Sequence, residues 1–263
     1  TREDGTTTEE SAYFLCANRG KRSITLDVSS KVGQDLLHEL VKDCDVFVEN
    51  YKFGDMQRYG LDFKTLSEIN PRLVYCSITG FGQTGPYRKR AGYDFVVQAM
   101  GGLMSITGER DGVPGGGPQK CGVPISDLMT GMYASVAIVS ALFERVGSGR
   151  GQYIDMSLLD KQVAWLANQA SNYLVGGSHP RRWGNAHPNL APYQSFPASD
   201  GSLIVAVGND RQFRAMCEAL GLINLPDDDR YRRNADRLKN RESLVEVLSA
   251  RFEEEERDTW LKL

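Results

Sequence analysis

The chain has 263 residues, of which 41% are hydrophobic and 25% are charged, a composition typical of a globular protein with one large or two smaller domains. A formal net charge of -3 excludes the strongly basic surface of most nucleic-acid-binding proteins, so we expect no nucleic-acid partner. No uninterrupted apolar run approaches the roughly 18 to 20 residues that cross a bilayer, so we expect no membrane association.

Helical and strand patterns alternate in the first third of the chain. Residues 31–43 carry apolar side chains at helical spacing, and residues 45–49 form a short β-branched and aromatic run. A short helix is predicted over 64–69, before Pro71, and a second strand over 73–78. This order predicts an α/β fold with a parallel sheet, in which ligands bind beyond the carboxyl ends of the strands.

The middle of the chain is more helical. One helix is predicted over 93–104, and a long apolar helix begins at Ser126-Asp127 and runs to about Arg145, closed by Gly147 and Gly149. A strand over 152–156 and one helix over 158–174 follow. The Gly- and Pro-rich stretch 111–118 is interpreted as a flexible loop, since it lacks the strand-to-helix context of a phosphate-binding loop.

The last third begins with an irregular segment, 181–197, that is rich in Pro, Asn and Gly. A strand over 203–207 and helices over 211–220 and 242–255 come after it. We therefore predict a large domain over 1–185 and a small domain over 186–263. The chain starts without Met and stops within a helical pattern at Leu263, so we expect a fragment that lacks part of both domains.

Generic site motifs do not identify a function. The five cysteines lie far apart with no CxxC pair, which favours free thiols in a reducing compartment. The three histidines, His38, His179 and His187, have no metal-ligand spacing, so no metal site is expected. No dinucleotide fingerprint, P-loop, nucleophile elbow or zinc-protease motif is present. The composition and periodicity alone therefore indicate an α/β protein and leave open whether it is an enzyme.

A series of ordered motifs is more specific. They are Asn18-Arg19-Gly20-Lys21-Arg22-Ser23-Ile24-Thr25-Leu26-Asp27, Val48-Glu49-Asn50-Tyr51-Lys52-Phe53-Gly54, Ser77-Ile78-Thr79-Gly80-Phe81-Gly82, Ala91-Gly92-Tyr93-Asp94 and Gly149-Arg150-Gly151-Gln152-Tyr153-Ile154-Asp155. In this order and spacing the chain resembles the class III CoA-transferases, the formyl-CoA and carnitine CoA-transferase type. Phe53 departs from that pattern, which has proline there. Within the family, residues 182–187 and 192–196 are most similar to the succinate–hydroxymethylglutarate (glutarate) CoA-transferases.

The resemblance implies an architecture and a reaction class. It implies a doubly wound, mostly parallel α/β large domain with a smaller α/β domain, in a homodimer whose two chains interlock. The implied reaction moves CoA between carboxylic acids, from succinyl-CoA to glutarate or hydroxymethylglutarate. Coenzyme A and acyl-CoA are then substrates, with no permanently bound cofactor, and the location is mitochondrial.

The resemblance also assigns the nucleophile. The family's catalytic aspartate opens a long helix, and the matching residue is Asp127 in Ser126-Asp127-Leu128-Met129-Thr130-Gly131. A carboxylate is ionised at neutral pH, and the N-terminus of a helix is expected to favour the anion further. Such a group can form an aspartyl-CoA thioester by covalent catalysis. Ser126 stands where many relatives have glycine, a difference that would change access to the carboxylate. Without the family, a simple helix cap is the better interpretation of Asp127.

The implied CoA-binding residues follow the two predicted strands. They are Asn50, Tyr51, Lys52, Gly54, Gly80, Phe81, Gly82, Arg90, Tyr93 and Asp94. Lys52 is suited to a nucleotide phosphate, and the glycines allow the backbone to approach a ligand. The alternative for these residues is a pair of ordinary turns with solvated cations.

Three alternatives concern the reaction and its specificity. The family's acyl-CoA racemases have a histidine base where this chain has Tyr93, and a tyrosine with pKa near 10 is a poor base, which favours a transferase. For the distal carboxylate of a dicarboxylate the candidates are Arg181, Arg182 and His187, although solvated arginines fit equally well. A non-catalytic CoA-binding or interaction protein is the third alternative.

Overall fold

The computed structural model describes residues 5–7 and 10–263, and the chain divides into two compact units. The first unit contains residues up to 77 together with 137–154, and the second contains 78–136 and 155–263. The expected domains 1–185 and 186–263 stay a prediction, and residues 1–4 and 8–9 of the expected large domain lie outside the described residues.

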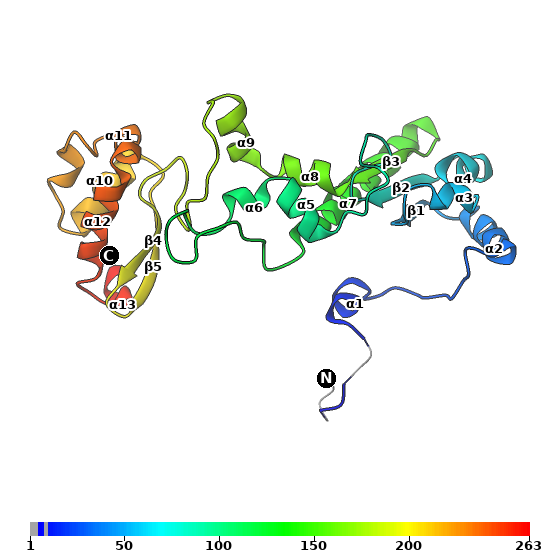
Figure 1. Cartoon of the computed structure of the whole chain (residues 1–263), viewed down its shortest axis with the longest axis horizontal. Helices are drawn as coiled ribbons and strands as arrows, with labels where there is room; N and C mark the ends of the chain where they lie inside the picture. The colour runs from blue at the N-terminus through cyan, green and yellow to red at the C-terminus, as the bar shows by residue number, and fades with distance from the viewer. Residues whose placement is uncertain (1–4, 8–9) are drawn as a thin grey trace. The chain divides into compact units, whose positions relative to one another are not determined.

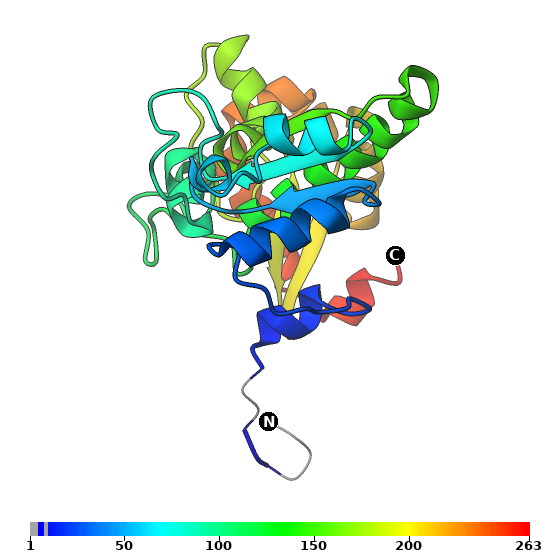
Figure 2. The ribbon, with the colours of Figure 1, turned by 90° about the vertical axis from the view of Figure 1, so that its right-hand side faces the viewer.

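The first unit begins with helices and strands in alternation. In chain order its elements are α1 (Ala12–Ala17), α2 (Lys31–Val41), β1 (Val46–Glu49), α3 (Asp55–Arg58), α4 (Phe63–Ile69) and the first part of β2 (Val74–Thr79). Local chemistry sets the helix starts, because the Ser30 hydroxyl accepts from the Gly33 N–H at α2 and the Asp62 carboxylate accepts from the Lys64 and Thr65 N–H groups at α4. Figure 2 shows α2 beside the strands. The predicted helices 31–43 and 64–69 and both predicted strands are confirmed.

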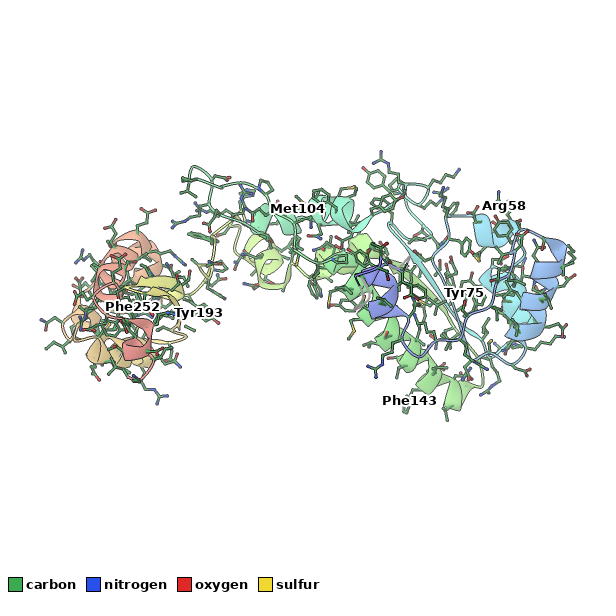
Figure 3. The ribbon with its side chains drawn as sticks, turned by 90° about the horizontal axis from the view of Figure 1, so that it is seen from below. Arg58, Tyr75, Met104, Phe143, Tyr193 and Phe252 are labelled. Carbon is green, nitrogen blue, oxygen red and sulfur yellow. The ribbon has the colours of Figure 1, made fainter. Side chains whose placement is uncertain are left out.

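The three-stranded sheet, most of which belongs to this unit, is parallel where the sequence predicted it. Its strand order is β1-β2-β3, with β3 at Tyr153–Ser157, and β1 pairs in parallel with β2 in the register Val46 to Val74. Tyr75, labelled in Figure 3, stacks on Phe47 with 5.2 Å between ring centroids and donates its hydroxyl to the Leu61 carbonyl. This core confirms the α/β class. It also fixes β2, the strand that is followed by the turn Gly80-Phe81-Gly82, called the glycine turn below.

A long helix, α7 (Ile125–Ser148), carries Asp127 in its first turn. It ends as predicted at Gly149, which has a φ of +74° and donates its N–H to the Arg145 carbonyl. Many of its apolar side chains are exposed, among them Phe143 at 82% (Figure 3). By length and composition α7 is the one helix among residues 5–7 and 10–263 that could cross a membrane. The expectation that no apolar segment approaches membrane-spanning length is therefore wrong for α7. This helix contains few charged residues, so it is long and apolar enough by these two measures.

In the second unit, two segments that were each predicted as one continuous helix form two shorter helices. The segment 93–104 forms α5 (Asp94–Met100) and α6 (Leu103–Ile106), because Gly102 takes a left-handed φ of +86° between them. The segment 158–174 forms α8 (Leu158–Ala164) and α9 (Ala167–Leu174), with Ala167 at a φ of +46°. Both predictions of one uninterrupted helix are wrong, since a left-handed residue stops the helical ladder.

The C-terminal part of this unit packs helices against a two-stranded sheet (Figure 1). Its elements are β4 (Tyr193–Ala198), β5 (Gly201–Ala206), α10 (Asp210–Ala219), the 3-10 turn η1 (Leu225–Asp227), α11 (Asn234–Lys239), α12 (Arg241–Phe252) and α13 (Arg257–Trp260). β4 and β5 are antiparallel and pair Tyr193 with Ala206. The prediction that 181–197 is wholly irregular is wrong at β4. The buried side chains of Phe196, Phe213 and Leu244 belong to the core that joins the sheet to α10 and α12.

Candidate functional site

Asp127 lies exposed on the first turn of α7, and a neighbouring carboxylate holds the backbone beneath it. One oxygen of Asp94, Oδ1, accepts the Ser126 N–H at 2.7 Å and the Asp127 N–H at 3.3 Å. Asp94 is the first residue of α5. The start of α7 is therefore capped by a side chain from another helix, and the two amides that donate include that of the expected nucleophile.

The Asp94 carboxylate is itself fixed by a buried glutamine. Gln98 lies one turn further along α5, is fully buried, and donates from Nε2 to Asp94 Oδ2 at 2.6 Å. Its Oε1 accepts the Cys121 N–H at 2.9 Å, from the segment just before α7. Gln98 therefore ties both the cap and the approach to α7 to one side chain.

Ser126 anchors the same turn on its other side. Its hydroxyl donates to Gln162 Oε1 at 2.6 Å, and its carbonyl accepts the Thr130 hydroxyl at 2.7 Å. Ser126, Thr130 and Gln162 are all buried. The serine hydroxyl is therefore held by Gln162 of α8, and this contact gives a physical role to a residue that departs from the family's glycine.

The electrostatic effect at Asp127 is opposite to the one expected from the helix alone. Partial burial raises the pKa of the Asp127 carboxyl above its usual 3.8, and the negative charge of Asp94 raises it further. The helix amides that would favour the anion already donate to Asp94. The expectation that the helix N-terminus favours the Asp127 anion is therefore wrong in its net sign, because desolvation and the Asp94 charge prevail.

The glycine turn after β2 exists because two backbones cross at van der Waals distance. A Cβ placed on Gly80 would lie 2.4 Å from the Gly92 Cα, and a Cβ on Gly92 would lie 2.4 Å from the Gly80 Cα. The Gly80 carbonyl also accepts the Leu159 N–H at 3.1 Å from α8. This crossing brings the segment that leads to Tyr93 and Asp94 against the end of β2.

The rest of this turn combines a glycine with a carboxylate and two aromatic rings. Gly82 has a φ of +79° and donates to the Thr79 hydroxyl at 2.9 Å. Asp155 Oδ2 accepts the Gln83 N–H at 2.9 Å, while its buried Oδ1 has no hydrogen-bond partner among the described residues.

The Phe81 ring meets the Tyr87 ring edge-on, with 5.6 Å between the ring centroids. The Arg90 guanidinium lies 4.2 Å from the centre of the Tyr87 ring. Tyr93 is 75% exposed. Gly80, Phe81, Gly82, Arg90, Tyr93 and Asp94 thus lie in the same unit as Asp127.

The other predicted CoA-binding turn belongs to the first unit and directly follows β1. The Tyr51 N–H donates to the buried Glu49 carboxylate at 2.7 Å, and Gly54 takes a φ of +86° at the start of α3. The side chains of Asn50, Tyr51 and Lys52 are exposed. This is the form of turn that can present an amide, a ring and a cation to a ligand.

Two of the three residues expected to hold a distal carboxylate, Arg182 and His187, have other partners. The Arg182 guanidinium forms an ion pair with Asp111 and donates from Nη1 to the Ser105 carbonyl at 3.2 Å. His187 Nδ1 accepts the Asn189 N–H at 3.0 Å, and burial followed by the Arg241 charge lowers the pKa of its imidazole. A lowered pKa favours the neutral ring, which would bind a carboxylate as a hydrogen-bond donor and not as a cation.

Three polar residues that hold this site, two of them buried and one half-buried, were given no role from the sequence. Gln98, Gln162 and Asp155 hold the turns that carry the predicted residues. The only sequence signal was a polar side chain within an apolar helical or strand pattern, as at Gln98 between Val97 and Ala99. Such a pattern does not reveal the distant partners, because Cys121, Ser126 and Gln83 lie 23, 36 and 72 residues from the side chains that contact them.

A family model and the curated relatives of this chain agree on one protein family. The model of CoA-transferase family III matches residues 1–263. The chain is 51% identical over 238 residues to the succinate–glutarate CoA-transferase of Agrobacterium fabrum, covering 90% of this chain and 58% of that protein. It is 45% identical over 254 residues to human succinyl-CoA:glutarate CoA-transferase, covering 97% of this chain and 57% of that protein.

A solved structure agrees with these sequence matches. The crystal structure of a CAIB/BAIF family protein from Brucella suis matches with a TM-score of 0.79 and 50% identity, over 96% of this chain and 66% of that one. The chain thus spans less than two thirds of the length of the two curated relatives, at 58% and 57%.

Proposed function

The chain belongs to CoA-transferase family III, and we propose that its protein moves CoA between dicarboxylic acids, from succinyl-CoA to glutarate, with Asp127 as the nucleophile. The observation that carries the proposal is the exposed Asp127 carboxylate on a turn fixed by Asp94, Gln98 and Gln162. The names of the bacterial and human relatives support the two acids.

The proposed reaction passes through covalent intermediates on Asp127. A carboxylate oxygen attacks the thioester carbon of succinyl-CoA, and the carbon–sulfur bond breaks to give a mixed anhydride and CoA thiolate. The thiolate then attacks the Asp127 carbonyl carbon, succinate leaves, and an aspartyl-CoA thioester remains. Glutarate attacks that thioester, and the returning thiolate forms glutaryl-CoA and restores the Asp127 carboxylate. No net proton is consumed.

The electrostatics of Asp127 suit a nucleophile. A raised pKa makes the carboxylate more basic, and a more basic oxygen is a stronger nucleophile as long as it is ionised at the working pH. Asp94 contributes to this effect without touching the reacting atoms, so it is a positioning residue. We also propose that Gln98 and Gln162 keep the Asp127 backbone in one orientation, since precise placement lowers the entropic cost of attack.

CoA binding is proposed for the two glycine-containing turns. The residues are Asn50, Tyr51, Lys52 and Gly54 in the first unit, and Gly80, Phe81, Gly82, Arg90, Tyr93 and Asp94 in the second. Lys52 and Arg90 are exposed cations suited to phosphates, and Phe81 and Tyr93 offer aromatic surface. Asp94 would act in this set through the α7 backbone and not as a phosphate contact, because it is negatively charged.

For the distal carboxylate we propose Arg182 and His187. The Arg182 side chain is 10% exposed and its partner Asp111 is 78% exposed, so the guanidinium needs a carboxylate partner and a substrate carboxylate would take the place of Asp111. Neutral His187 would add a hydrogen bond.

The homodimer and the mitochondrial location also remain proposals. Light scattering of the full-length protein tests the first, and fractionation of source cells tests the second.

The activity test uses the full-length protein with succinyl-CoA and glutarate, with glutaryl-CoA followed by mass spectrometry. Wild type should form product, and Asp127→Asn should not. The control is Asp160→Asn, which removes an exposed carboxylate at the start of α8 and should also form product. Equal product from Asp127→Asn would refute the nucleophile. If wild type forms none, α-proton exchange of an acyl-CoA would point to the racemase alternative, and CoA binding without either reaction would point to a binding protein.

A further inference from the structure

A cavity of about 480 Å³ in the second unit is lined by Arg110, Trp183, residues 238–240 and the first turn of α12. Its volume falls in the range of small-molecule sites. Asp127 and the glycine turns are not among its lining residues.

Arg241, the first residue of α12, lines this cavity and is only 6% exposed. Its Nη2 donates to the His187 carbonyl at 2.7 Å and also reaches the Pro188 and Leu190 carbonyls. Nε and Nη1 are buried and have no hydrogen-bond partner among the described residues. Buried guanidinium donors are normally satisfied, so two unused donors on a residue that lines a cavity indicate a missing acceptor.

The charges around the cavity indicate the sign of that acceptor. Arg110 and Lys239 are exposed cations on its wall, and with Arg241 they outnumber the single carboxylate, Glu242. Burial lowers the pKa of the Arg241 guanidinium, and the charge of nearby Arg110 lowers it further, a repulsion that a bound anion would relieve. Neither Arg110 nor Arg241 has an ion pair within residues 5–7 and 10–263.

The start of α12 adds backbone donors of the same kind. α12 has 12 residues, and its N-cap Asn240 makes no side-chain cap. The Asn240 amide instead donates to the Arg230 and Asp236 carbonyls. Residues 241–243 of this first turn line the cavity, and the N-cap side chain provides no acceptor for their N–H groups.

Trp183 completes the wall with an aromatic ring. The Arg241 guanidinium lies 4.8 Å from the ring centre, and Arg181 lies 5.1 Å from it. The ring shields Arg241 from water, which strengthens its attraction for an anion.

We propose that this cavity is an oxyanion-binding site, which takes the carboxylate or phosphate group of a small molecule between Arg110, Arg241 and the first turn of α12. Arginine and helix N-terminal amides recognise both groups with charge-assisted hydrogen bonds. The site does not depend on the proposed CoA transfer.

The test is calorimetric titration of the full-length protein with inorganic phosphate and, separately, with succinate, at constant ionic strength. Arg110→Ala removes an exposed cation of the cavity, and Arg211→Ala is the matched control, an exposed arginine of α10 outside it. We expect saturable binding of one anion, weakened about tenfold by Arg110→Ala, the effect of one charge-assisted contact, and less than twofold by Arg211→Ala.

The two arms identify the source, since phosphate binding indicates a phosphorylated ligand and succinate binding a carboxylic acid. Arg241→Lys, which keeps the charge but loses the Nη1 donor, should weaken the same anion in protein whose circular dichroism matches wild type. Absence of saturation with both anions, or equal affinity in wild type and Arg110→Ala, would overturn the proposal.

Discussion

The cap that Asp94 places on α7 gives a stability prediction with a magnitude. In Asp94→Ala, the N–H of Ser126, which is 2% exposed, and the Nε2 of Gln98, which is fully buried, both lose their acceptor. An unsatisfied buried donor costs about 1–3 kcal/mol, so the two together should lower the free energy of unfolding by about 3 kcal/mol. The Asp127 N–H contributes little, since it lies in an exposed residue at 3.3 Å from Asp94. Relief of the repulsion with Asp127 offsets a small part of this loss.

Urea denaturation followed by far-UV circular dichroism measures this change. Asp160→Ala is the matched control, because Asp160 is an exposed carboxylate in the first turn of α8 and should cost less than about 0.5 kcal/mol. Asp94→Asn keeps an acceptor for Ser126 but sets an amide N–H₂ against the Gln98 donor, and it should fall between the two. If Asp94→Ala is no more destabilising than Asp160→Ala, the cap is not what fixes the start of α7.

Three further predictions use the same kinds of contact. Gly92→Ala sets a Cβ at 2.4 Å from the Gly80 Cα and should cost about 2–3 kcal/mol, while Gly122→Ala, with nothing within 4 Å, should be near neutral in the same urea assay. Because the folded pKa of Asp127 is raised above 3.8, ionising it costs stability. Asp127→Asn should therefore match wild type below pH 3.8, gain stability relative to wild type as pH rises from there to the folded pKa, and keep that gain above it; an equal difference at every pH would contradict this. Burial raises the pKa of the Cys217 thiol to about 12, so at pH 8 a thiol reagent should label exposed Cys16 and spare Cys217 until the protein unfolds; fast labelling of Cys217 in native protein would disagree.

Local signals in the sequence predicted much of the α/β core. The helix over 31–43, the strands over 45–49 and 73–78 and the long helix from Ser126 carry strong periodicity or clear end signals, and all four are present. The pattern failed where a single backbone torsion decides. Gly102 and Ala167 take left-handed conformations at the breaks between α5 and α6 and between α8 and α9, and the apolar periodicity continues across each break.

The strand β4 was missed for a different reason. Its sequence, Tyr193 to Ala198, includes Pro197 and follows a Pro- and Asn-rich stretch, so it resembles a loop. It becomes a strand because β5 supplies an antiparallel partner, with Phe196 facing the core. Pairing of this kind is tertiary information that a local window does not contain.

The candidate site divides in the same way. The family motifs supplied the residues that we propose meet the substrates, such as Asp127, Gly80 and Tyr93, but nothing local identified the residues that hold them. The bonds from Gln98 to Cys121 and from Gln162 to Ser126 join segments 23 and 36 residues apart. The sign of the pKa shift at Asp127 also depends on Asp94, whose contact with α7 the sequence did not reveal.

The most direct test of the central claim is to trap the covalent intermediate on Asp127. The full-length protein is incubated with succinyl-CoA without an acceptor acid, quenched in acid, digested and mapped by mass spectrometry. The account predicts a CoA adduct on the peptide that contains Asp127, which disappears when glutarate is added and is absent in Asp127→Asn. An adduct on another carboxylate, or glutaryl-CoA formation by Asp127→Asn, would contradict it.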